Sequence, residues 1–197
     1  MKHTRIVSIV LAALLLPACG GDKDYETQFQ DSVFVGDSLT EGISFNEYLP
    51  EEQVVAGAGA TAGFAMEDLD QVVEQEPDRV YILLGQCDLL WPEGDPLALF
   101  QENYTAYLDA LTERLPDCKL YLQSIPHVSE EALETEPRYG QIDAYNQVIA
   151  ELAETYHAVY VDLNGLVDAN QDLYAEDGVH FQKEFYPMWL DLLAETE

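Results

Sequence analysis

Basic side chains are scarce in this sequence. Its 197 residues include only 8 lysines and arginines against 38 aspartates and glutamates, which gives a formal net charge of −30. Proteins that bind a phosphate backbone need clustered lysine and arginine, so this deficit excludes nucleic acid as a partner. Other anionic polymers should also be repelled. Hydrophobic residues nevertheless make up 48% of the chain, which is enough to fill the core of one ordinary domain.

Cysteine is also rare, because the chain contains only Cys19, Cys87 and Cys118. Cys87 follows one predicted strand and Cys118 precedes the next, so the two should lie at opposite ends of neighbouring parallel strands. Six-residue strands would separate them by roughly 20 Å, far beyond the ~7 Å limit for a disulfide. We therefore expect no disulfide. The pattern also implies no metal site, because Leu173 and Val179 stand where a calcium loop beginning at Asp168 would need glycine and glutamate.

Long hydrophobic runs are missing, and the most apolar stretch covers residues 6–16, just after Lys2 and Arg5. An eleven-residue helix spans about 16 Å, half of a bilayer core, so this stretch is too short to cross a membrane. It is typical of a signal peptide over residues 1–18. Leu16-Pro17-Ala18-Cys19 resembles the lipobox of bacterial lipoproteins, which implies cleavage before Cys19 and lipid attachment to its sulfur.

An ordinary secretory signal is the alternative, and both interpretations place the mature protein outside the cytoplasm. Cleavage would remove Lys2 and Arg5 but no acid, which changes the net charge from −30 to −32. Residues 19–30 are then expected to be a lipidated cysteine with a polar tether. The membrane would be contacted only through this lipid anchor.

From residue 31 to the C-terminus, short apolar runs alternate with longer amphipathic stretches. This alternation predicts a single α/β domain over residues 31–197, with a five-stranded parallel sheet. The predicted strands cover residues 32–35, 53–56, 79–84, 119–124 and 158–162, and the predicted helices cover 39–48, 65–76, 97–115, 139–156 and 183–195. Ligands of such sheets bind beyond the carboxyl ends of the strands, so candidate site residues should directly follow each strand.

Ser38 follows the first predicted strand in such a position, between Gly36 and a predicted helix. A serine hydroxyl needs a base to become a nucleophile. His157 lies at the wrong end of the sheet, and His127 has no carboxylate near it in sequence before Glu130. His180 is favoured because Asp177, three residues before it, can orient and charge-stabilise its imidazole.

Gly-Asp-Ser-Leu at residues 36–39, together with Asp-x-x-His at 177–180, resembles the SGNH/GDSL hydrolase family. The resemblance covers nearly all of residues 31–197. It implies a flavodoxin-like three-layer α/β/α sandwich and a catalytic triad that cleaves esters through an acyl-enzyme. Carried over by motif, Ser38 is the nucleophile, His180 the base and Asp177 its partner. The resemblance implies no cofactor.

Two further blocks of the family concern the oxyanion hole. Ala58-Gly59-Ala60-Thr61 looks like the block that supplies a glycine N–H, so Gly59 is expected to assist the Ser38 N–H; Gly57 and Gly63 are alternatives. The family usually reads Gly-x-Asn-Asp in the other block, whereas this chain has Gly85-Gln86-Cys87-Asp88. Cys87 thus replaces the asparagine donor, and a thiol is only a weak donor. A slower enzyme, compensation by Gln86, or a site that binds without turnover would each be consistent with this replacement.

We expect an extracytoplasmic serine esterase, acting as a monomer on a short acyl group attached to a carbohydrate or another polar alcohol. A lysophospholipase or thioesterase of the same family is the alternative, as is a catalytically degenerate binding lipoprotein. Trp91 and Pro92 could line a substrate groove, whereas Trp189 is expected in the core. Residues 127–138 are expected to form a polar surface loop that rims the site.

Overall fold

The computed structural model describes residues 23–196, and the predicted signal peptide and Cys19 lie outside the described residues. Its centre is a five-stranded parallel sheet with the strand order β2-β1-β3-β4-β5. The strands are β1 (Ser32–Gly36), β2 (Val54–Ala56), β3 (Arg79–Leu83), β4 (Lys119–Gln123) and β5 (Val159–Val161). The predicted five-stranded parallel sheet is therefore confirmed, and each strand end differs from the prediction by one residue at most.

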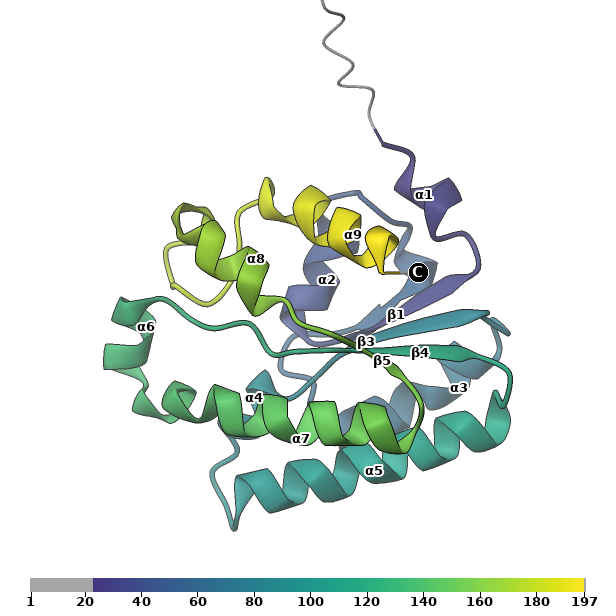
Figure 1. Cartoon of the computed structure of the whole chain (residues 1–197), viewed down its shortest axis with the longest axis horizontal. Helices are drawn as coiled ribbons and strands as arrows, with labels where there is room; N and C mark the ends of the chain where they lie inside the picture. The colour runs from purple at the N-terminus through teal and green to yellow at the C-terminus, as the bar shows by residue number, and fades with distance from the viewer. Residues whose placement is uncertain (1–22, 197) are drawn as a thin grey trace, which may run out of the picture.

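Helices cover both faces of the sheet and complete a three-layer α/β/α sandwich (Figure 1). The α-helices are α1 (Tyr25–Gln28), α2 (Ser38–Phe45), α3 (Leu69–Val73), α4 (Gln86–Leu89), α5 (Pro96–Arg114), α6 (Glu130–Thr135), α7 (Ile142–Thr155), α8 (Asn164–Ala169) and α9 (Phe185–Glu195). The short 3-10 helices are η1 (Glu51–Gln53), η2 (Phe64–Asp68), η3 (Pro137–Gln141) and η4 (Gln171–Leu173). The expected α/β/α fold is thus confirmed.

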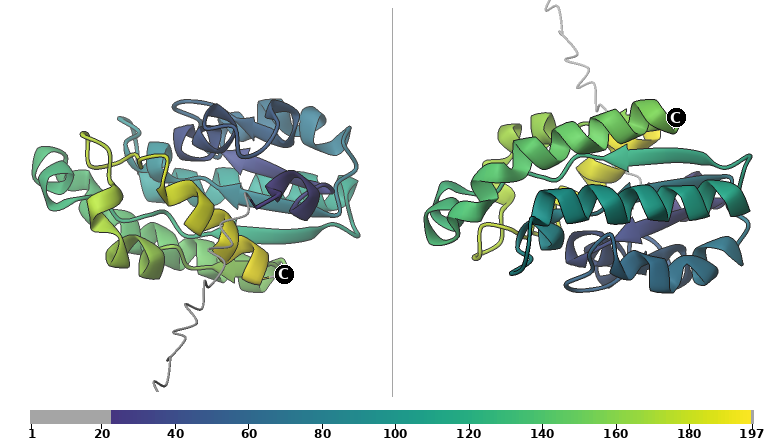
Figure 2. Two further views of the ribbon diagram at one scale, coloured as in Figure 1. Left: turned by 90° about the horizontal axis from the view of Figure 1, so that it is seen from above. Right: turned by 90° about the horizontal axis from the view of Figure 1, so that it is seen from below.

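Alternation along each strand divides the core into two clusters. Val33, Val80 and Ile82 face α5 and α7, whereas Phe34 and Tyr81 face the opposite layer of α2 and α9. Successive side chains of a strand point to opposite faces, so a buried strand supplies both clusters at once. The two layers are seen from above and below in Figure 2. Trp189 lies in the second cluster at 1% exposure, as predicted.

Three segments differ from the sequence-based expectation. The tether was expected to reach residue 30, but residues 25–28 form α1, and Tyr25 and Phe29 are buried. The stretch 127–138, expected to be a loop, contains α6, which Ser129 caps through its side chain. The second predicted helix is split into η2 and α3. In the first segment, the burial of two aromatic side chains outweighs the polar composition. In the second, the capping serine stabilises the start of a short helix in a polar stretch.

None of the helices within residues 23–196 combines the length and apolar character needed to cross a membrane. Cys87 and Cys118 are both free thiols in this part of the chain. The strand order reverses direction between β1 and β3, with β2 on one side and β4 on the other. Such a switch point opens a crevice beyond the carboxyl ends of the two strands, which is where ligands of this architecture bind.

Candidate active site

Ser38 begins α2 directly beyond β1 and is half-buried. Asp37 caps the helix, because its Oδ1 accepts a hydrogen bond of 2.9 Å from the Leu39 N–H. The turn requires glycine at position 36. A Cβ there would lie 2.1 Å from Thr40 Oγ1 and 2.6 Å from the Leu83 carbonyl oxygen. This tight strand-to-helix turn fixes the Ser38 hydroxyl at the switch point of the sheet.

Asp177 and His180 lie on a small hairpin between η4 and α9. Tyr174 and Phe181 pair across it as an antiparallel bridge, and the Ala175 N–H donates to the His180 carbonyl oxygen. At its tip Gly178 has φ +68°, a conformation that favours glycine. The Ser129 N–H donates to the Gly178 carbonyl oxygen and ties the hairpin to the segment after β4.

The three predicted catalytic side chains form one hydrogen-bonded chain. Asp177 Oδ2 lies 2.6 Å from His180 Nδ1, and His180 Nε2 lies 2.8 Å from Ser38 Oγ. An ionised carboxylate only accepts, so Nδ1 carries the proton and Nε2 is left to accept from the serine hydroxyl. The arrangement has the bonding order of a catalytic triad.

Asp177 is held in the form that this arrangement needs. Partial burial by itself would raise its pKa, but hydrogen bonds from the Val179 N–H and from the ring and N–H of His180 hold the pKa below its ordinary value. Asp177 Oδ1 accepts both backbone N–H groups at 2.9 Å. The carboxylate is therefore ionised at neutral pH and fixed in position toward the imidazole.

Of the three glycines considered for the oxyanion hole, Gly59 has the most suitable backbone. It has φ +81°, and its N–H points at the sulfur of Cys87. The Gly57 N–H already donates to the Gly36 carbonyl oxygen at 3.3 Å. Gly63 approaches Asn103 of α5 instead, because a Cβ at Gly63 would lie 3.0 Å from Asn103 Nδ2. These contacts favour the register that places Gly59 at the site, beside Ser38 at the N-terminus of α2.

Cys87 lies in α4, directly after β3, and its side chain faces the site. Its Sγ is 4.0 Å from Asp37 Oδ2, which makes the thiol a weak donor to that carboxylate. Burial, together with the charges of Asp37 and Asp88, raises the pKa of Cys87 to about 12. The thiol therefore stays protonated at neutral pH, which argues against an independent thiolate nucleophile.

Gln86, considered as a replacement donor, is 5% exposed. Neither its amide nitrogen nor its amide oxygen has a hydrogen-bond partner among the described residues. Gly85 before it has φ +124°, and a Cβ there would lie 2.7 Å from Ile125 Cδ1, so the turn into α4 needs glycine. No hydrogen bond therefore joins the Gln86 amide to Ser38 or Gly59 within residues 23–196.

Two buried aspartates carry roles that the sequence analysis did not assign. Burial raises the pKa of Asp37 to about 6, although the Leu39 N–H and the nearby His180 oppose this shift. Burial also raises the pKa of Asp88 to about 7, although Asp88 accepts from the Ala62 N–H through both oxygens at 3.1 Å. Asp88 thereby fastens the loop that carries Gly59 to the helix that carries Cys87. Asp37 stands two residues before the predicted helix at 39–48, and an aspartate near the start of a helix is a signal for a capping role.

The two other histidines among the described residues, His127 and His157, lie apart from Ser38. His127 Nε2 is 3.0 Å from Asp143 Oδ1, and its Nδ1 is 3.4 Å from Asp168 Oδ1. Burial would lower the pKa of His127, but these two carboxylates raise it above its ordinary value. His157 lies between α7 and β5, at the amino end of the strand. Within residues 23–196, no group of three or more histidine, cysteine or acidic side chains could hold a metal ion.

Several solved structures share this fold. A GDSL-like lipase from Bacteroides thetaiotaomicron is 18% identical with a TM-score of 0.69, and the match covers 86% of this chain and 88% of the lipase. A lipase/acylhydrolase from Enterococcus faecalis is 17% identical with a TM-score of 0.68, over 83% of this chain and 93% of its own. An acetylxylan esterase from Geobacillus stearothermophilus, solved as a catalytic mutant, is 19% identical with a TM-score of 0.62. This match covers 84% of this chain and 92% of the esterase.

At these identities the structural likeness establishes the fold alone. Among curated proteins, none matches this chain in sequence. The sequence profile of the GDSL-like lipase/acylhydrolase family, in contrast, matches residues 34–186, which include both Ser38 and His180. The match spans more than half of the chain and reaches from β1 into α9. The chain therefore belongs to the GDSL-like lipase/acylhydrolase family.

Proposed function

We propose that this protein is a serine esterase that hydrolyses a neutral carboxylic ester through an acyl-enzyme. The observation that carries the proposal is the continuous hydrogen-bonded chain from Asp177 through His180 to Ser38. A nucleophile and its base within hydrogen-bond reach, with the base oriented by a third group, are the structural signature of nucleophilic catalysis. Membership of an acylhydrolase family supports the same reaction class.

In the proposed mechanism, Ser38 Oγ attacks the ester carbonyl carbon while its proton passes to His180 Nε2. The N–H groups of Ser38 and Gly59 stabilise the negative charge on the carbonyl oxygen. His180 then protonates the leaving alcohol oxygen, and the bond to the alcohol breaks to leave an acyl group on Ser38. A water molecule then attacks the acyl carbon while its proton passes to His180 Nε2. The bond between this carbon and Ser38 Oγ breaks, His180 returns the proton to Oγ, and the carboxylic acid is released. Asp177 stabilises the imidazolium in both halves of the reaction.

For the substrate, we propose a short acyl group on a carbohydrate or another polar alcohol. The net charge of −30 opposes the approach of anionic polymers, so the body of the protein favours neutral esters. The solved relatives include an acetyl-xylooligosaccharide esterase, 20% identical with a TM-score of 0.61 over 84% of this chain and 92% of its own. That likeness supports the substrate class only through the shared fold.

We also propose that the enzyme works outside the cytoplasm, attached by a lipid on Cys19. The support is the sequence alone: a basic start, an apolar stretch over residues 6–16 and a cysteine directly after Ala18. Lys23, the first described residue, is exposed on the surface, and Tyr25 begins the folded domain. The chain between Cys19 and the fold is therefore short, which would hold the domain close to the membrane surface.

The Ser38→Ala variant tests the proposed reaction. Because the nucleophile is lost, we expect kcat/KM for a small ester such as ethyl acetate to fall by about 10⁴-fold or more. The measurement is proton release at constant pH, together with labelling by a fluorophosphonate probe, which reacts only with an activated serine. Ser44→Ala, in the same helix, is the matched control and should label normally. Equal hydrolysis by wild type and Ser38→Ala would remove Ser38 from the mechanism.

A binding protein with a degenerate site is the second candidate, and the contact of Cys87 with Asp37 favours it. The thiol is directed to a carboxylate at 4.0 Å and is a weak donor even when free. This candidate predicts that wild-type protein fails to react with the fluorophosphonate probe but still binds the ester. Labelling at Ser38 would exclude it.

A further inference from the structure

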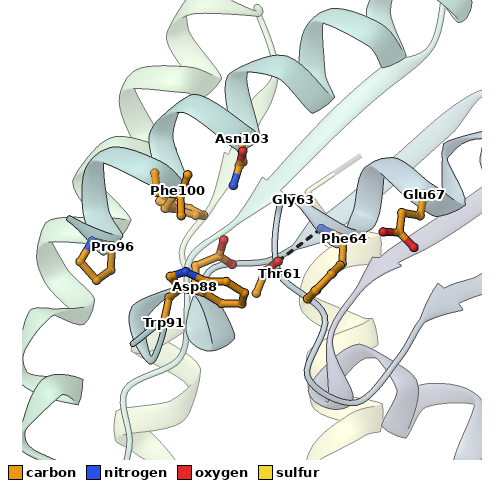
Figure 3. Close-up of a pocket in the computed structure, with 10 residues that line it drawn as sticks. Thr61, Gly63, Phe64, Glu67, Asp88, Trp91, Pro96, Phe100 and Asn103 are labelled. Atoms are coloured by element: carbon orange, nitrogen blue, oxygen red, sulfur yellow. Dashed lines mark hydrogen bonds between the residues drawn. The ribbon is translucent and has the colours of Figure 1, made fainter. Parts of the chain in front are cut away.

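A cavity of about 190 Å³ lies beside the candidate active site, between η2, α4 and the first turns of α5. Figure 3 shows Phe64 and Trp91 at its front, with Asp88 and Thr61 between them and Asn103 of α5 above. Phe100, Leu99 and Pro96 complete an apolar wall. Neither Ser38 nor His180 lines this cavity. The catalytic side chains themselves thus do not form its wall, and the proposed mechanism assigns no role to its lining.

The cavity is continuous with the loops that carry the candidate oxyanion donors. Asp88 directly follows Cys87 in α4, and Thr61 lies two residues after Gly59. Asp88 also binds the Ala62 N–H, which holds the two loops against each other. Phe64 borders both this cavity and the hollow formed by residues 57–60. The cavity therefore adjoins the two loops that carry Gly59 and Cys87.

Large apolar side chains are exposed at the mouth of the cavity. Phe64 is 47% exposed, and Trp91 and Leu99 are each 37% exposed. The rings of Phe64 and Trp91 meet edge to face, with centroids 6.3 Å apart and planes at 68°. Three of the six exposed large hydrophobic side chains in residues 23–196 thus gather at one opening. Such gathering on a monomer surface marks a place where a ligand or partner binds.

Polar side chains sit among these apolar ones. The Asp88 carboxylate forms part of the floor, the Asn103 amide projects toward the space from α5, and Glu67 lies at the rim (Figure 3). A purely alkyl ligand would bury the Asn103 amide without giving it a hydrogen-bond partner, which is unfavourable. The lining therefore suits a group with one apolar face and several hydroxyls, and the two carboxylates disfavour a negative charge on it.

The cavity has the size of a single six-membered ring. A cavity of roughly 150 Å³ in another protein holds one benzene molecule. An acetyl group is much smaller than a six-membered ring and would leave most of this cavity empty. We propose, on the basis of the proposed function, that this cavity binds the sugar ring in the alcohol portion of the ester. The apolar C–H face of a neutral pyranose lies on the Trp91 ring, and its hydroxyls bond to Asn103 and Asp88. Trp91 and Asn103 are then specificity-determining residues for the alcohol, while Ser38 receives a small acyl group.

The test compares three esters on wild type and Trp91→Ala: a monoacetylated methyl xylopyranoside, ethyl acetate and methyl hexanoate. The first carries a ring on the alcohol side, the second carries no ring, and the third carries a long acyl chain. We expect the ratio of kcat/KM for the sugar ester to that for ethyl acetate to fall about tenfold, mainly through KM. Phe45→Ala, which removes an 84% exposed aromatic ring of α2, is the matched control and should leave the ratio unchanged.

Fluorescence gives a readout that does not depend on turnover. The chain has two tryptophans, Trp91 at the mouth and Trp189 in the core. In Ser38→Ala protein, which should bind the ester without cleaving it, the acetylated xylopyranoside should change the tryptophan emission. The double variant with Trp91→Phe should lose this response, because Trp189 is too deeply buried to sense the ligand.

Two outcomes would overturn the proposal. One is an unchanged ratio between the sugar ester and ethyl acetate in Trp91→Ala. The other is a selective loss on methyl hexanoate, which would make the cavity an acyl-chain site. Failure of the proposed function is distinct from both, because it would show as hydrolysis of ethyl acetate that survives Ser38→Ala.

Discussion

Cys87 is the residue at which this chain departs from the pattern of its family. Gly85, Gln86 and Asp88 keep the turn and the buried carboxylate, and only the amide donor between them is replaced. The replacement is a protonated thiol that contacts Asp37 and receives the Gly59 N–H. Of these two contacts, the Gly59 N–H is the one expected to donate to a reacting carbonyl oxygen, and without substrate it is directed at the sulfur. The candidate site thus has the bonding order of a triad, with a thiol at the position where the family resemblance implies an amide donor.

The variant Cys87→Asn tests how much the replacement of an amide donor by a thiol lowers the rate of ester hydrolysis. An asparagine amide is a stronger hydrogen-bond donor than a thiol, and losing one oxyanion donor elsewhere lowers the rate about 10²–10³-fold. We expect Cys87→Asn to raise kcat on ethyl acetate by about tenfold or more, with a smaller change in KM. The measurement is initial rate against ester concentration for wild type, Cys87→Asn and the control Cys118→Ser. A lower or unchanged kcat in folded Cys87→Asn would mean that no donor is missing.

Some residues of the candidate site could be predicted from the sequence, and others could not. Ser38 could be chosen because it directly follows a predicted strand, and His180 because Asp177 stands three residues before it, a spacing that resembles the family motif. The contacts of Asp37 with Cys87, and of Asp88 with Ala62, could not be predicted in the same way. They join segments from different strands, and their partners depend on how far each loop bends. Such contacts are set by packing, which no local pattern records.

Among the helices, the long ones agree with their predicted ranges and the short ones do not. The periodic stretches predicted at 97–115 and 139–156 correspond to α5 and α7, because a helix of three or more turns buries a continuous apolar stripe. The helices α4, α6 and α8 have four to six residues each. A helix of this length is unstable alone, and its neighbours decide whether it forms. Prediction from periodicity fails for such elements.

The first helix, α1, illustrates the same point at the start of the domain. Its residues are polar apart from Tyr25, yet Tyr25 and the following Phe29 anchor it to the fold. The Tyr25 hydroxyl donates to the Pro187 carbonyl oxygen and to Asp191 of α9. Phe29 meets the rings of Phe34 and Tyr81 edge to face, with centroids 5.3 and 5.6 Å away. The segment belongs to the folded unit and closes one end of the second core cluster.

Truncation of Phe29 tests whether α1 is part of the cooperative fold. Phe29 is fully buried, so Phe29→Ala should leave a cavity and lower the free energy of unfolding by about 3–5 kcal/mol. Urea unfolding followed by circular dichroism measures the change. Glu26→Ala, at an exposed position within α1, should shift the free energy of unfolding by less than about 0.5 kcal/mol. If Phe29→Ala and Glu26→Ala had the same free energy of unfolding, residues 25–29 would not take part in the cooperative fold.

At the scale of the whole molecule, the sheet and the charge act on function in different ways. The strand order places the carboxyl ends of β1 and β3 side by side, with Ser38 after one and Cys87 after the other. The place of the candidate site therefore follows from the order of the strands and does not depend on the residues at the protein surface. The net charge of −30 sets which molecules approach that position, and it disfavours anionic ones. It also disfavours any anionic membrane, so electrostatic attraction cannot hold this protein at a bilayer.

The lipid proposed on Cys19 must therefore supply the whole of the membrane attachment. Two acyl chains on one residue suffice for stable anchoring, whereas a single chain gives only marginal binding. In a bacterial host, we expect wild-type protein to sediment with membranes and to remain there after a wash in about 1 M salt, because screening weakens only charge-based contacts. Cys19→Ser should move the protein into the soluble extracytoplasmic fraction, while Cys118→Ser should behave as wild type. Sedimentation of Cys19→Ser with membranes, or release of the wild type by salt, would show that something other than a lipid at Cys19 holds the protein.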